Sequence, residues 1–117
     1  MSERGDAECI GDIMESIRRI QAYTKGMTYQ KFLKDSKTQD AVVRNIEIIG
    51  EAVKNISSDF KKKRRTIEWE KIAGMRDKLV HRYFGVNLDI VWDVVREKLP
   101  ELRNQIKALG IIVKYYI

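Results

Sequence analysis

Apolar residues recur at steps of three and four along two long stretches of this chain, and this spacing restricts the fold more than any other feature. In both stretches, from Cys9 to Thr24 and from about Thr38 to Ser57, it puts the apolar side chains on one face of a helix. These side chains are Ile10, Ile13, Met14, Ile17 and Ile20, then Val42, Ile46, Ile49, Val53 and Ile56. The second helix has an adjoining stripe of Ala41, Ile48 and Ala52, so we expect it to contact two neighbours.

Shorter helices are expected around these two. Thr28 is a suitable N-cap, Asn87 or Leu88 can begin a helix, Gly85 marks a turn, and Pro100 fits the first turn of a last helix. The expected additional helices cover about residues 29–33, 66–83, 87–99 and 100–112. With one proline and seven glycines, the chain has few of the turn residues that an all-β fold requires. We therefore predict an all-α bundle of four to six helices in a single domain, residues 1–117.

The composition sets further limits. Hydrophobic residues make up 44% of the chain, which is enough for a core, and the formal net charge of +6 attracts polyanions without specifying one. Cys9 is the only cysteine, so an intramolecular disulfide is excluded and a reducing compartment is expected. The longest nearly continuous apolar stretch, Ala108 to Val113, is too short to span a bilayer. We expect a cytoplasmic protein with no membrane partner.

Arg76 is the most unusual residue of the expected helix over residues 66–83. On an ideal helix it falls between Trp69 and Val80, in the middle of the apolar stripe. A buried arginine needs a partner, so it pairs with Glu47 or Glu51, extends to solvent, or lies on a face that something else covers. Arg44, Glu47 and Glu51 share one side of their helix, where an ion-pair ladder is favoured over a metal pair, and no metal site is predicted.

His81 is the only histidine and lies five residues after Arg76. Histidine transfers protons near neutral pH and arginine binds phosphate oxygens, so the pair suits phosphodiester chemistry. Asp77, four residues before His81, can orient the imidazole if the helix is regular. Tyr83 would then share the face of Arg76, whereas His81 would point about 140° away, so either the helix is distorted or copies from two subunits converge. The ordinary alternative for a lone histidine near a helix end is a cap or a packing residue.

The residues from Arg76 to Tyr83 form the pattern R-x4-H-x-Y, and further blocks accompany it. The blocks are Phe32 to Asp35, Gln39 to Asn45, Ile48 to Ala52, Trp69, Gly74 to Arg76, Tyr83 to Val86, Val91 to Trp92 and Leu99 to Leu102. With these blocks the sequence resembles the HEPN superfamily, specifically the HepT-like toxins that pair with minimal nucleotidyltransferase antitoxins. The resemblance covers most of the chain.

The resemblance implies a two-fold homodimer whose two motifs face one cleft. It also implies a toxin that cleaves RNA without a metal or cofactor: a ribose 2′-hydroxyl attacks the adjacent phosphate, His81 transfers a proton, and Arg76 stabilises the developing charge. Asp77 supports the site. The implied partners are RNA, a second copy of the chain and the antitoxin, which would neutralise the toxin by binding it or by nucleotidylating Tyr83.

Two departures from the family pattern bear on RNA binding. Asp77 stands where the superfamily often has asparagine, and five consecutive cations at residues 61–65 stand where relatives commonly have a proline. Such a run predicts a loop or a frayed end, either simply solvated or in contact with phosphates. The candidate RNA contacts are Lys61, Lys62, Lys63, Arg64, Arg65, Lys78 and Arg82. The alternative function is a non-catalytic helical nucleotide-binding or adaptor subunit of a nucleotidyltransferase, but the complete motif favours the enzyme.

Overall fold

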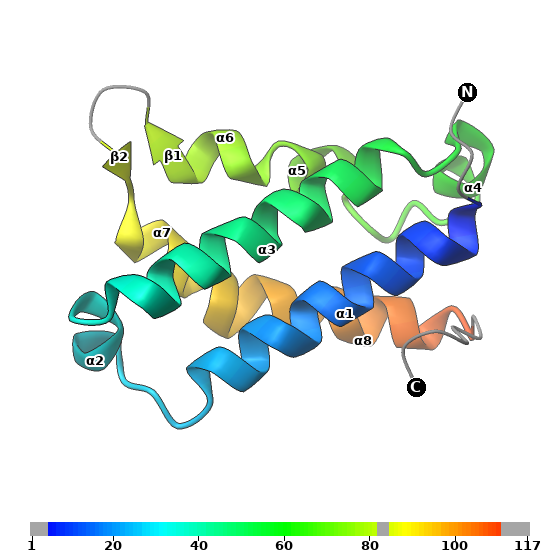
Figure 1. Ribbon diagram of the computed structural model, residues 1–117. Helices are drawn as coiled ribbons and strands as arrows, with labels where there is room; N and C mark the ends of the chain where they lie inside the picture. Colours follow the sequence, from blue (N-terminus) through cyan, green and yellow to red (C-terminus); the bar gives the residue numbers. More distant parts are fainter. Residues whose placement is uncertain (1–4, 82–84, 111–117) are drawn as a thin grey trace.

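We describe the fold from a computed structural model that covers residues 5–81 and 85–110, with only the backbone described at Val80 and His81. The all-α class is confirmed, because helices account for nearly all regular structure in these residues. Figure 1 shows the long helices of residues 6–24 and 36–54 side by side, the short helices of residues 69–79 along the latter, and a third long helix, residues 88–108, which contacts both the first long helix and the short helices. No helix in the described ranges is both long and apolar enough to cross a membrane.

The two long amphipathic helices are α1 (Asp6–Thr24) and α3 (Ser36–Lys54), and both begin a little earlier than predicted. Asp6 and Glu8 lie in the first turn of α1, where negative charge favours the helix dipole. The Asp35 side chain caps α3 by accepting a hydrogen bond from the Thr38 amide at 3.0 Å. The predicted apolar faces form the core, where each fully buried isoleucine contributes about 1.5–3 kcal/mol.

In the sequence, α1 and α3 are separated by the short helix α2 (Tyr29–Leu33), which Thr28 caps as predicted. Its Phe32 is fully buried and packs against Trp92, with ring centroids 5.0 Å apart. Tyr29 donates a hydrogen bond to Asp89. These contacts join α2 to the third long helix, whose N-terminal half begins after Asn87.

The expected single helix over residues 66–83 is wrong. A short helix, α4 (Ser58–Lys62), precedes this stretch, which itself forms α5 (Trp69–Ala73) and α6 (Met75–Leu79), followed by an antiparallel strand pair, β1 (Val80–His81) and β2 (Gly85–Val86). Gly74 divides α5 from α6, because glycine is a poor helix former and here caps α5. The helix ends at Leu79, whose carbonyl accepts a hydrogen bond from the Asn87 amide at 2.8 Å instead of continuing the helix. Gly85 has a φ of 77°, which suits the predicted turn.

The third long helix consists of three consecutive segments, α7 (Leu88–Asp93), the π-helical η1 (Val94–Lys98) and α8 (Leu99–Ala108). Asn87 caps it through its side chain, as predicted. Pro100 lies in the first turn of α8 as expected, yet it does not separate two helices, because Lys98 and Leu99 keep helical dihedral angles. Proline lacks an amide hydrogen and its ring crowds the carbonyl four residues earlier, which accounts for the π-turn just before it. The predicted end at Ile112 lies outside the described residues.

Candidate active site around Arg76

Arg76 lies on α6 with its side chain 51% exposed, so it is not buried in the core. Its Nε lies 3.7 Å from Oε2 of Glu47 on α3, and its Nη1 lies 3.6 Å from Oδ1 of Asp77. Both distances are too long for hydrogen bonds, so charge attraction places the guanidinium without occupying its N–H donors. Of the two partners expected for Arg76, Glu47 is therefore the one that the fold supplies.

Gly50, one turn after Glu47, determines how closely α5 approaches α3. A side-chain carbon at this position would lie 3.2 Å from the carbonyl oxygen of Ala73, tighter than ordinary packing allows. The absence of a side chain lets the end of α5 rest on α3, and α6 follows directly. The result is a small pocket of about 230 Å³, lined by Glu47, Gly50, Glu51, Lys54, Ala73, Arg76 and Asp77. The apolar spacing alone does not predict this role of Gly50, although a glycine within a regular apolar pattern often marks a close approach of another backbone.

His81 occupies the second position of β1, opposite Gly85, rather than a helical position. The prediction that Asp77 orients His81 across one helical turn is therefore wrong in its premise, because the helix ends between them. Asp77 instead pairs with Arg76. Arg82 and Tyr83 lie outside the described residues, as does the side chain of His81.

Residues 13–109 match a family described as ribonuclease HepT-like. The chain belongs to this HepT-like family. A candidate RNase of Methanocaldococcus jannaschii is 48% identical over 88% of this chain and 83% of its own length. A protein of Thermococcus cleftensis named probable ribonuclease HepT is 44% identical over 92% of this chain and 97% of its own length. No solved structure gave a significant match. The resemblance inferred from the R-x4-H-x-Y pattern and its accompanying blocks is thus confirmed at the level of the family.

The basic run of this HepT-like protein begins at the end of a helix. Lys61 and Lys62 are the last two residues of α4, so the first part of the run corresponds to a helix end rather than to a loop, the other predicted alternative. Arg64 stacks on the Phe60 ring, 3.8 Å from its centroid, and Lys63 pairs with Asp59 at 3.2 Å. Helix formation is favoured because Ser57 caps α4 by accepting a hydrogen bond from the Phe60 amide.

The fold does not bring the basic run to Arg76. Figure 1 shows α4 beside one end of α3, and α6 with the strand pair toward the other end. Lys61, Lys62 and Arg65 line a separate pocket of about 380 Å³. Lys78, by contrast, shares α6 with Arg76. The candidate RNA contacts therefore divide into a group near the motif and a group at α4.

One acid of α3 pairs with the arginine. Glu47 pairs with Arg76, and no group of three or more potential metal ligands occurs among the described residues. Arg44, Glu47 and Glu51 also border a pocket of about 410 Å³ between α1 and α3, next to Cys9 and Asp12. Glu47 thus lies at the boundary between two surface depressions.

Proposed function

We propose that this protein is a metal-independent endoribonuclease and the toxin of a HepT-type toxin–antitoxin pair, acting in the cytoplasm. The observation that carries the proposal is the half-exposed Arg76 of the R-x4-H-x-Y pattern, whose charge partners among the described residues lie no closer than 3.6 and 3.7 Å and leave its N–H donors able to bind phosphate. The names of its relatives as ribonucleases support the same activity.

The proposed reaction uses the nucleophile that RNA itself carries. The 2′-oxygen of a ribose attacks the adjacent phosphorus, the bond from phosphorus to the 5′-oxygen breaks, and the products are a 2′,3′-cyclic phosphate and a 5′-hydroxyl. His81 moves a proton at this centre, either from the 2′-hydroxyl or to the leaving oxygen. Arg76 donates hydrogen bonds to the phosphate oxygens as their negative charge develops, which is the stage where a fixed cation helps most.

Cleavage of a labelled single-stranded RNA by the purified protein tests this proposal. We expect 2′,3′-cyclic phosphate ends in the presence of a chelator, and loss of cleavage in His81→Ala with helical content retained, because removing a proton-transfer group costs about 10²–10⁴ in rate. Equal cleavage by wild type and His81→Ala would identify a contaminating nuclease. Dependence on a divalent metal would refute the proposed chemistry.

The active form would be a two-fold homodimer in which two motifs share one cleft. The exposed position of Arg76 and the acids on the outer side of α3 support it, because a second copy can cover this face and supply a further cation. Light scattering at micromolar concentration should give twice the chain mass. A strictly monomeric protein that cleaves RNA would refute the composite cleft.

Neutralisation by a minimal nucleotidyltransferase would act at Tyr83, two residues after His81. Nucleotide phosphates attached there would compete with RNA for nearby cations and repel its backbone. Co-expression with such a partner should add nucleotidyl mass that Tyr83→Phe lacks. Addition at another residue would refute the assignment, and inhibition without added mass would show neutralisation by binding alone.

A further inference from the structure

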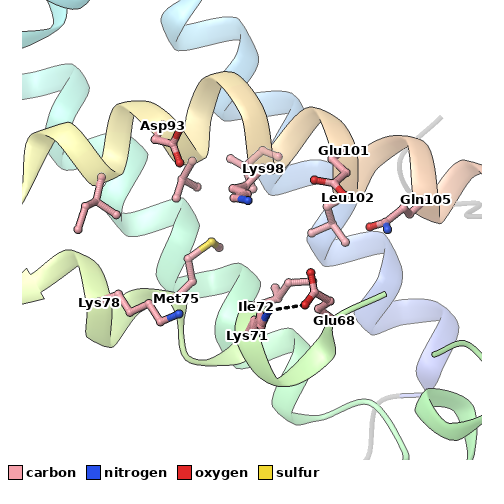
Figure 2. Close-up of a pocket in the computed structure, with 13 residues that line it drawn as sticks. Glu68, Lys71, Ile72, Met75, Lys78, Asp93, Lys98, Glu101, Leu102 and Gln105 are labelled. Atoms are coloured by element: carbon pink, nitrogen blue, oxygen red, sulfur yellow. Dashed lines mark ion pairs between the residues drawn. The ribbon is translucent and has the colours of Figure 1, made fainter. Parts of the chain in front are cut away.

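A second cavity adjoins the motif helix on the side that faces the third long helix. It has a volume of about 320 Å³, at the lower end of the range for small-molecule sites, and lies between α5–α6 and α7–η1–α8. Its apolar lining consists of Ile72, Met75, Ile90, Val94, Leu99 and Leu102. Figure 2 shows polar side chains from both helical layers around this floor.

Three lysines converge on the cavity. Lys71 pairs with Glu68 at 2.6 Å, and Lys78 and Lys98 line the same space. Glu68 lines the cavity together with all three lysines, and the pKa of its carboxyl is lowered, chiefly by its hydrogen bond from Lys71 and further by the charges of Lys98 and Lys78. Within the described ranges, neither Lys78 nor Lys98 forms an ion pair, so both ammonium groups are available to an anion.

The backbone is irregular where the third long helix borders this cavity. Val94 and Lys98, the first and last residues of the π-helical η1, both contribute to the lining. A π-turn interrupts the regular hydrogen-bond pattern of an α-helix, and such turns are frequent at functional sites. The irregularity thus coincides with the position of an unpaired lysine.

Hydrogen-bond acceptors lie at the end of the cavity away from Lys78. Figure 2 shows Lys78 at one end and Glu101 with Gln105 at the other, and Lys98 between them. The Gln105 amide nitrogen donates to the Thr66 carbonyl oxygen at 3.1 Å, which leaves its side-chain oxygen free to accept. Asp93 and Glu68 balance the remaining positive charge. A ligand with one anionic group, a flat apolar body and N–H donors fits this arrangement better than a uniform polyanion.

We propose that this cavity binds one nucleotide of the RNA strand, with its phosphate toward Lys78 and Lys98. The base rests on the apolar floor and directs an exocyclic amino group toward Glu101 and Gln105. Cytosine offers such an amino group to a carboxylate, whereas uracil presents a carbonyl there. This inference rests on the proposed function, because the bound strand would pass to Arg76 on the same helix, α6.

Binding of fluorescent 2′-O-methyl oligocytidine and oligouridine to the wild-type protein tests the site independently of cleavage, since these strands lack the nucleophile. We expect oligocytidine to bind more tightly. Lys98→Gln should weaken its binding roughly tenfold through the loss of a charged hydrogen bond. Glu101→Gln should reduce the preference for cytosine over uracil. Lys25→Gln, which removes an equal charge just after α1, serves as the matched control and should bind as the wild type does.

Three outcomes would overturn the site: equal affinity of Lys98→Gln and Lys25→Gln, no discrimination between the two strands, or equally tight Lys98-dependent binding of an oligoaspartate peptide. Free cytidine monophosphate distinguishes the source of the nucleotide. If cytidine monophosphate binds more weakly than oligocytidine, the cavity is a subsite for RNA. If it binds as tightly as oligocytidine, that assignment is overturned in favour of a site for a free nucleotide. If the protein cleaves RNA but Lys98→Gln does not change strand binding, the nucleotide site is refuted and the nuclease activity is not. If strand binding depends on Lys98 but the protein does not cleave RNA, the nuclease activity is refuted and the nucleotide site is not.

Discussion

The paired helices α1 and α3 and the segment of α5, α6, β1 and β2 are built in opposite ways. Each of the paired helices has 19 residues and a face of fully buried isoleucines, whereas α5 and α6 have five residues each and carry the half-exposed Arg76. Helices as short as α5 and α6 are unstable alone, so they depend on docking through buried residues such as Trp69 and Leu79. Stability and the candidate chemistry therefore occupy different regions.

Helix α3 belongs to both regions. Ile46 is fully buried in the core, and the next residue, Glu47, is partly exposed and lies 3.7 Å from Arg76. A rotation of 100° between consecutive residues is enough to make one a core residue and the other a site residue. Substitutions at such positions can separate the two roles.

The largest effect should come from Arg76→Ala. We expect RNA cleavage to fall about 10²–10³-fold, because a fixed cation is lost where charge develops. The free energy of unfolding measured in urea should stay within about 0.5 kcal/mol of the wild-type value, since the side chain is half exposed. Cleavage rates and unfolding curves measured on the same preparation provide the check. A large loss of stability would show that the short-helix region also holds the fold together.

Ile46→Ala should produce the reverse pattern. Removing a fully buried isoleucine costs about 2–5 kcal/mol, so the urea midpoint should fall clearly. The cleavage rate of the protein that remains folded should change little. A similar fall in both quantities would mean that the core and the site are not separable. Ile48, partly exposed on the same helix, provides a control in which Ile48→Ala should cost much less.

Glu47→Gln tests whether α3 positions Arg76. We expect kcat to fall roughly tenfold, because a misplaced cation stabilises the transition state poorly. We expect KM for RNA to stay the same or fall, because the substitution removes a carboxylate that repels phosphate. Glu51→Gln, in the same pocket, should leave both constants near those of the wild type. Equal effects of the two substitutions would indicate that only the total charge matters.

The smallest effect should be on how the free energy of unfolding depends on pH, through Glu15 on α1. Hydrogen bonds from Arg18 and Arg19 lower the pKa of the Glu15 carboxyl from 4.5 to about 2. A lowered folded-state pKa means that this contribution is present above pH 4.5 and is lost as the pH falls through 2. The contribution should not exceed about 1 kcal/mol, because both arginines are largely exposed. Urea unfolding at pH 5 and pH 2.5 should show a smaller pH dependence for Glu15→Gln than for wild type, whereas equal slopes would contradict the assignment.

The sequence by itself determined the paired helices α1 and α3, the caps at Thr28 and Asn87, and the family. Each follows from local information: three- and four-residue spacing defines a helical face, a capping side chain bonds to an amide two or three residues away, and the motif blocks are read directly from residue order. These features needed no knowledge of distant contacts.

Only the tertiary structure decided where the motif helix ends and which acid meets Arg76. Leu79 to Val80 could continue a helix by spacing alone, but the Leu79 carbonyl is taken by the amide of Asn87. Likewise, Glu47 and Glu51 lie one turn apart on α3, and the position of α5 against Gly50 determines which of them reaches the guanidinium. Backbone carbonyls and charged side chains bond to whatever the packing brings near, and periodicity along one segment carries no record of the segment that packs against it.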